Sequence, residues 1–244
     1  MVSPLNLLRT ALVALFAACL ALAPAHAADG RFIILETTVE YEIVDADTAE
    51  AVDADTHASQ RHAPAPALLR EGDVGPRFGP FTVVDGQTAR MAGSVTSATP
   101  REFAAMMAAH PGLKRIELID CPGSLDEEAN LRLARMVRRA GLATHVPEGG
   151  SVRSGAVELF LAGVTRSAHP TAEFGVHSWR DEAGLEARDY PADDPVHAEY
   201  LDYYREMGLD ADAARAFYAL TNASDYDQMN YLTKADIARY VALN

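Results

Sequence analysis

The sequence predicts an α/β fold with a largely parallel sheet in its main segment, residues 79–244. From Gly79 onward, short runs of apolar and β-branched residues alternate with amphipathic segments of helical period. Pro-Gly and Gly-rich turns separate these runs. Because strands that alternate with helices are joined by crossovers, such a pattern is typical of a parallel sheet with helices packed on it.

The individual elements follow in chain order. Strands are predicted over residues 81–84, 89–95, 115–119 and 142–146, and helices over 99–110, 126–140 and 154–163. Thr99 followed by Pro100 marks a helix start, and Gly141 marks a helix end. The last part is helical, over 197–207, 212–220 and 233–242, and carries a set of tyrosines that we interpret as core or interface.

The N-terminal part differs in character from the rest. Residues 1–27 contain Arg9 as their only charge, an apolar run, and the small-x-small pattern Ala25-His26-Ala27, which together predict a cleaved signal peptide. A lipoprotein anchored at Cys19 is the weaker alternative. Residues 28–78 combine a strand-like run with an acidic linker rich in Ala, Asp and Pro. We therefore expect a secreted, most simply periplasmic, protein without a membrane span after signal removal.

The net charge and the cysteine content limit which partners and which chemistry the sequence allows. Without residues 1–27 the chain carries 20 basic and 35 acidic residues, a formal charge of −15, so nucleic acid is not an expected partner. Cys121 is then the single cysteine, and its position at the end of an apolar strand favours a buried structural thiol over a nucleophile. No metal site or cofactor is predicted.

A serine and a histidine are the candidate reactive groups. Ser154 lies directly before an apolar helical run, and His177 follows 23 positions later between small and apolar residues. Histidine is the usual base that activates a hydroxyl nucleophile. The competing interpretation makes Ser154 an ordinary helix N-cap and His177 a buried, backbone-bonded histidine.

The order of these pieces resembles the ClpP-like branch of the Clp/crotonase superfamily. The matching pieces are the strand at 91–95, the helix at 100–110, the strand and Pro-Gly turn at 116–123, the helix at 126–142, the strand at 144–147, the serine turn and helix at 154–163, and Gly175-Val176-His177. Arg166 also fits. The resemblance implies a spiral of ββα units, Ser154 as nucleophile and His177 as base.

The resemblance also implies an oxyanion hole and a third catalytic residue. The backbone N–H groups of Gly155 and Ser124 would form the hole, although Ser124 replaces a usual glycine. The family's acid precedes an aromatic-Leu-Ser/Thr segment, here Tyr231-Leu232-Thr233; Met229 aligns best with it, and Asp227 is the nearby candidate. A Ser-His dyad and an inactive site remain alternatives.

Two functions therefore follow from the sequence. The first is a secreted, ATP-independent serine hydrolase acting on a peptide or protein, since no phosphate-binding loop is present. The second is a non-catalytic binding or assembly module of the cell envelope. A homo-oligomer is a further expectation. Glu158, one turn after Ser154, is either a second acid near the site or the partner of an arginine across a subunit contact.

Overall fold

A nine-stranded sheet organises the part of the chain that the computed structural model describes, residue 61 and residues 75–244. These residues all belong to one compact unit of the chain. The predicted signal peptide, the strand-like run near residue 31 and most of the acidic linker lie outside the described residues.

The strands of this sheet are β1 (Arg77–Phe78), β2 (Phe81–Val83), β3 (Thr88–Ala92), β4 (Arg115–Cys121), β5 (Ala143–Val146), β6 (Ser151–Arg153), β7 (Arg166–Ala168), β8 (Glu173–Val176) and β9 (Asn230–Thr233). The helices are α2 (Thr99–Ala109), α3 (Glu127–Arg139), α4 (Gly155–Leu161), α5 (Ala198–Glu206), α6 (Ala211–Thr221) and α7 (Lys234–Ile237), with short 3₁₀ turns η3 (Ala187–Asp189) and η4 (Pro195–His197).

The centre of the sheet is parallel and its edges are antiparallel. The main path runs β1-β2-β3-β4-β6-β8-β9, and the pairings β3–β4, β4–β6 and β6–β8 are all parallel. Strand β4 forks: its first half pairs with β5, which continues to β7, and its second half pairs with β6. The predicted α/β class with a largely parallel sheet and a helical C-terminal part is confirmed.

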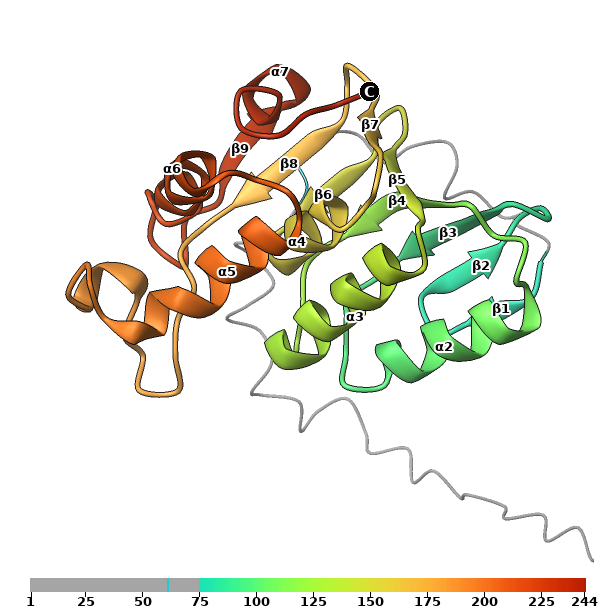
Figure 1. Ribbon diagram of the computed structural model, residues 1–244, viewed down its shortest axis with the longest axis horizontal. Coiled ribbons are helices and arrows are strands. Elements are labelled where there is room, and N and C mark those ends of the chain that lie inside the picture. The colour runs from blue at the N-terminus through green and yellow to red at the C-terminus, as the bar shows by residue number, and fades with distance from the viewer. Residues whose placement is uncertain (1–60, 62–74) are drawn as a thin grey trace, which may run out of the picture. The chain divides into compact units, whose positions relative to one another are not determined.

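Helices α2 and α3 lie side by side in front of the sheet, and α5 continues this row toward the C-terminal part (Figure 1). Helix α4 sits behind them and is buried along all seven of its residues. Apart from Glu158 its residues are apolar or glycine, and a helix of this composition packs in the interior. Phe160 from α4 and Phe174 from β8 meet there with ring centroids 5.0 Å apart.

Two predicted elements are shorter than expected. The predicted strand at 89–95 ends at Ala92, because Gly93 takes φ +115° and turns the chain out of the sheet. The predicted helix at 233–242 spans only Lys234–Ile237. After Ile237 the backbone bonds mix three- and four-residue spacing, since the Tyr240 and Val241 N–H groups both donate to the Ile237 carbonyl, and the regular helix gives way to turns.

Other boundaries agree closely with the sequence. Helix α3 is capped by Asp126, whose side chain accepts a hydrogen bond from the Ala129 N–H at 2.9 Å.

Among the described residues, no helix combines the length and apolarity that a bilayer crossing needs.

Candidate active site

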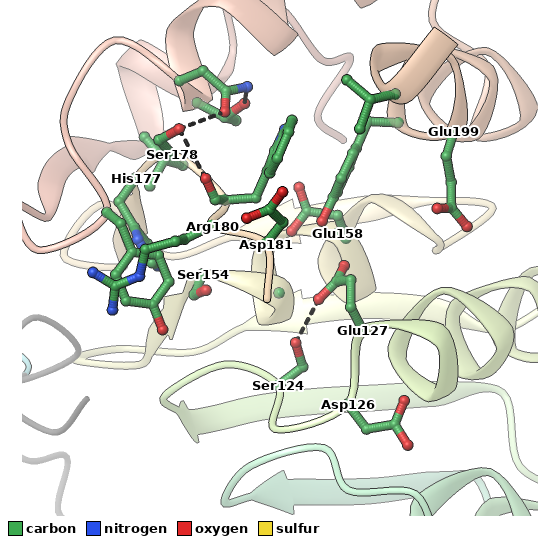
Figure 2. Close-up of a pocket in the computed structure, with 18 of the residues that line it drawn as sticks. Ser124, Asp126, Glu127, Ser154, Glu158, His177, Ser178, Arg180, Asp181 and Glu199 are labelled. Carbon is green, nitrogen blue, oxygen red and sulfur yellow. Dashed lines mark hydrogen bonds between the residues drawn. The ribbon is translucent and has the colours of Figure 1, made fainter. Parts of the chain in front are cut away.

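Parallel pairing of β6 and β8 brings Ser154 and His177 to the same edge of the sheet. Arg153, the last residue of β6, is in register with Gly175 of β8, and the Ser154 N–H donates to the Gly175 carbonyl at 2.8 Å. His177 is the first residue after β8. Carboxyl ends of adjacent parallel strands form crevices where sites are commonly built. Both side chains line one cavity of about 470 Å³ (Figure 2).

Ser154 has an unusual backbone conformation. Its φ is +48° and its ψ is −135°, and it is the one non-glycine residue with positive φ in the described part of the chain. Such a conformation costs about 1–3 kcal/mol for a residue with a Cβ and persists where surrounding structure enforces it. The Ser154 side chain makes no capping hydrogen bond to α4. Ser154 therefore occupies the N-cap position of α4 without capping the helix through its side chain.

The Pro-Gly turn after β4 packs directly against the serine turn. Gly123 takes φ +138°, and a Cβ there would lie 2.9 Å from the Ser154 Cβ and 3.3 Å from its Oγ. Only a residue without a side chain permits this approach. Ser124, the replacement in the resembling pattern, keeps a negative φ, so glycine is not needed at that position.

Two backbone N–H groups are available beside Ser154. Within residues 75–244, neither the Ser124 N–H nor the Gly155 N–H donates a backbone hydrogen bond. The two residues are in close contact, since a Cβ on Gly155 would lie 2.5 Å from the Ser124 Oγ. These N–H groups belong to the two turns that meet at Ser154, as an oxyanion hole requires.

Side-chain hydrogen bonds hold both turns against α3. The buried Asn130 side chain donates from Nδ2 to the Gly155 carbonyl at 2.8 Å. The Ser124 hydroxyl donates to Glu127 Oε2 at 2.6 Å, the contact drawn in Figure 2. Helix α3 therefore fixes the position of the serine turn and of the Pro-Gly turn at once.

The His177 ring is placed by aromatic packing. It meets Tyr226 edge to face, with ring centroids 4.9 Å apart. The Arg180 guanidinium stacks on the same tyrosine, 3.8 Å from the ring centroid. Both contacts are of the kind that fix ring orientation.

Asp227, the acid predicted from the resemblance, lies away from the cavity. Its side chain is 65% exposed and pairs with Arg180 at 3.3 Å. It is not among the residues that line the cavity. The structure thus brings Ser154, His177, Gly155 and Ser124 to one cavity and places Asp227 outside it.

Two carboxyl groups, the buried Glu158 and the half-buried Glu127, line the same cavity. Glu158 is 6% exposed, and its Oε1 accepts a hydrogen bond from the Tyr204 hydroxyl at 2.8 Å. Burial, together with the neighbouring Glu127, raises the pKa of Glu158 to about 8. Burial also raises the pKa of Glu127. Of the two roles considered for Glu158, the structure supports an acid near the site.

The other candidate nucleophiles, Cys121 and Ser178, are not available for reaction. Cys121 is fully buried, and burial raises the pKa of its thiol to about 12, so a thiolate nucleophile is excluded at neutral pH. Ser178 lines the cavity, but its hydroxyl donates to the Asn222 side chain at 3.2 Å. In residues 75–244, no group of three or more His, Cys, Asp or Glu side chains is arranged to hold a metal ion.

Sequence reasoning missed several cavity residues. The sequence indicates an amphipathic helix for Glu127 and a core or interface position for Tyr200 and Tyr204, yet all three line the cavity. The tyrosines come from α5, far along the chain from Ser154. The one signal in the sequence for this side of the cavity is the charged Glu158 within an otherwise apolar helix.

No model of a known protein family matches the sequence, and no curated protein matches it. Among solved structures, the chain is similar to a variant of the 1510-N membrane-bound stomatin-specific protease in complex with a substrate peptide. That likeness has 17% identity and a TM-score of 0.46 and covers 63% of this chain and 71% of the other.

Two related structures show the same likeness. A second 1510-N variant gives 16% identity and a TM-score of 0.46 over 63% of this chain and 75% of its own. The membrane protease specific for a stomatin homolog from Pyrococcus horikoshii gives 18% identity and a TM-score of 0.43 over 65% and 71%. At these values, none of the likenesses assigns a family or a reaction to this chain.

Proposed function

We propose that the protein is a serine hydrolase that cleaves peptide bonds with Ser154 as nucleophile and His177 as general base. The observation that carries this proposal is the strained backbone of Ser154, at φ +48°, in a cavity shared with His177. Ser154 has a strained backbone, its side chain does not cap α4, and it lies between two available N–H groups. No structural role for a serine in this conformation is evident. The resemblance of the sequence to ClpP-like proteins supports the same roles.

The geometry suggests how the reaction would proceed. The Ser154 Oγ attacks the scissile carbonyl carbon while its proton passes to the His177 ring. The carbonyl oxygen becomes an oxyanion and is held by the N–H groups of Gly155 and Ser124. His177 then gives its proton to the leaving amine, and water hydrolyses the acyl-enzyme by the same route.

The sequence also supports a proposal for where the protein acts in the cell and whether it needs ATP. The signal-peptide pattern of residues 1–27 supports a secreted protein, released by cleavage after Ala27. Absence of a phosphate-binding loop from the sequence supports turnover without ATP.

Labelling with a fluorophosphonate probe tests the nucleophile. We expect the folded protein to form a one-to-one adduct that maps to Ser154, and Ser154→Ala to abolish it. Ser178→Ala, which changes another serine of the cavity lining, should still label. An adduct that survives Ser154→Ala, or no adduct on the folded protein, overturns the proposal.

The placement of Asp227 favours a second candidate, a non-catalytic envelope module of the same fold. An exposed acid paired with Arg180 gives no direct support to the base. This alternative predicts a folded protein that does not label and whose partner binding is unchanged by Ser154→Ala.

A further inference from the structure

We propose that the cavity beside Ser154 selects a basic side chain, lysine or arginine, of the peptide substrate. This inference rests on the proposed function and specifies the substrate class of that same site. The residues that would select the cation are Glu127 and Glu158, with Tyr200 and Tyr204 beside them.

The charge of the cavity wall is strongly one-sided. Five carboxyl-bearing residues line it among those described: Asp126, Glu127, Glu158, Asp181 and Glu199. The lining contains one guanidinium, that of Arg180, and this group already pairs with Asp227 and stacks on Tyr226. A cation that enters the cavity is attracted to these carboxyl groups, and solvent screens the attraction least beside Glu127 and Glu158.

One shielded carboxyl oxygen in the cavity wall lacks a well-placed hydrogen-bond donor. Glu127 Oε1 is shielded from solvent and accepts no hydrogen bond of good geometry within the described part of the chain, although the Asn130 side chain and the Tyr200 hydroxyl lie near this carboxyl. Glu158 is 6% exposed and has the Tyr204 hydroxyl on its Oε1. Leaving a buried carboxyl oxygen unpaired is unfavourable, and an ammonium or guanidinium donor would satisfy it.

The position of these carboxyl groups suits a substrate side chain. Glu158 follows Ser154 by four residues on α4, which is about 6 Å along the helix axis. Glu127 is tied to the Pro-Gly turn through the Ser124 hydroxyl at 2.6 Å. Figure 2 shows both carboxyl groups on the wall beyond Ser154. A long basic side chain next to the scissile bond would extend along this wall.

The tyrosines add a surface for the apolar part of such a side chain. Tyr200 and Tyr204 line the cavity with ring centroids 6.4 Å apart. Aromatic faces attract cations, and they also cover the methylene stem of lysine or arginine. In the free protein Glu158 holds a proton near neutral pH because of its raised pKa, and a cation beside it favours the ionised carboxylate. An acidic substrate side chain would instead gain no ion pair there.

Paired activity probes test the inference. One peptidyl phosphonate carries a lysine-type side chain next to the phosphorus, and the other carries norleucine, which has nearly the same length without the charge. We expect the lysine probe to label Ser154 at least tenfold faster. Equal rates, or faster labelling by norleucine, would refute the inference while leaving the proposed nucleophile intact.

A binding measurement on a variant without the nucleophile tests the cation site independently of the proposed reaction. Acetyl-Ala-Ala-Lys-amide and its norleucine analogue are titrated into the Ser154→Ala protein and followed by NMR. We expect the lysine peptide to bind at least tenfold more tightly. If wild-type protein fails to label but this preference is found, the proposed function falls and the cation site stands; with no preference, the inference falls.

Matched variants test whether Glu127 is responsible for the lysine preference. Glu127→Gln keeps an acceptor for the Ser124 hydroxyl but removes a charge, and should reduce the ratio of the lysine to the norleucine labelling rate at least fivefold. Glu128→Gln, the neighbouring exposed residue outside the cavity, is the control and should keep the preference. Equal loss in both variants, or loss in neither, would contradict the assignment of Glu127.

Discussion

At the scale of single residues, Ser154 is defined by what surrounds it. Its strained φ is stabilised by its neighbours: the N–H bond to the Gly175 carbonyl at 2.8 Å, and Asn130, which holds the following residue. Gly123 approaches so closely that no side chain fits between the two turns. The conformation of this serine is thus a property of three separate segments, and not of its own sequence.

Gly123→Ala tests that close approach. A Cβ at 2.9 Å from the Ser154 Cβ must push the Pro-Gly turn away, so we expect fluorophosphonate labelling to fall about 10²-fold. Gly141→Ala is the matched control: Gly141 also has positive φ, but nothing lies within 4 Å of the position that a Cβ would take there. The control should lose about 1 kcal/mol of stability and keep its labelling rate. Equal labelling in both variants would refute the contact.

At the scale of elements, the contact between α4 and α5 closes the cavity wall. The Tyr203 hydroxyl donates to the Glu158 carbonyl at 2.5 Å, and the Tyr204 hydroxyl donates to the Glu158 carboxyl at 2.8 Å. Because Glu158 is buried between the helices, its ionisation is coupled to their packing.

The pH dependence of stability follows from this coupling. The pKa of Glu158 is about 8 when folded and about 4.5 when unfolded, so between these values the folded state holds a proton that the unfolded chain releases. Stability therefore falls as pH rises through this window, by up to about 1.4 kcal/mol per pH unit. Glu158→Gln should remove this contribution, and its gain in Tm over wild type should be larger at pH 8 than at pH 5.

A control and a contrary result sharpen this test. Glu199→Gln changes an exposed carboxylate at the cavity, and its Tm difference from wild type should stay small at both pH values. If the Tm gain of Glu158→Gln is the same at pH 5 and pH 8, Glu158 does not bind the extra proton in the folded state.

The elements themselves are largely predictable from the sequence. Helix α3 has a capping aspartate, an amphipathic period and a closing glycine, which are local signals, and its bounds agree within a residue. Strands β7 and β8 are not delimited by the sequence, because three- and four-residue buried strands carry little periodicity. The terminal helix is overestimated, since helical period continues past Ile237 while the regular helix gives way to turns.

At the scale of the whole molecule, the cavity depends on residues that are distant along the chain. Ser124, Ser154 and His177 converge because β4, β6 and β8 are parallel neighbours in one sheet, so an ordered set of strands predicts their meeting. The tyrosines of α5 and the position of Asp227 depend instead on how the C-terminal helices fold back. No local pattern specifies that packing, so the sequence does not predict it.

The most direct test of the proposed mechanism is a crystal structure of the protein after reaction with the lysine-type phosphonate. We predict phosphorus bonded to the Ser154 Oγ, with one phosphonyl oxygen about 2.7–3.1 Å from the N–H groups of Gly155 and Ser124. The basic side chain should lie against Glu127 and Glu158. An unmodified Ser154, or an adduct whose oxygen points away from both N–H groups, would contradict the central claim.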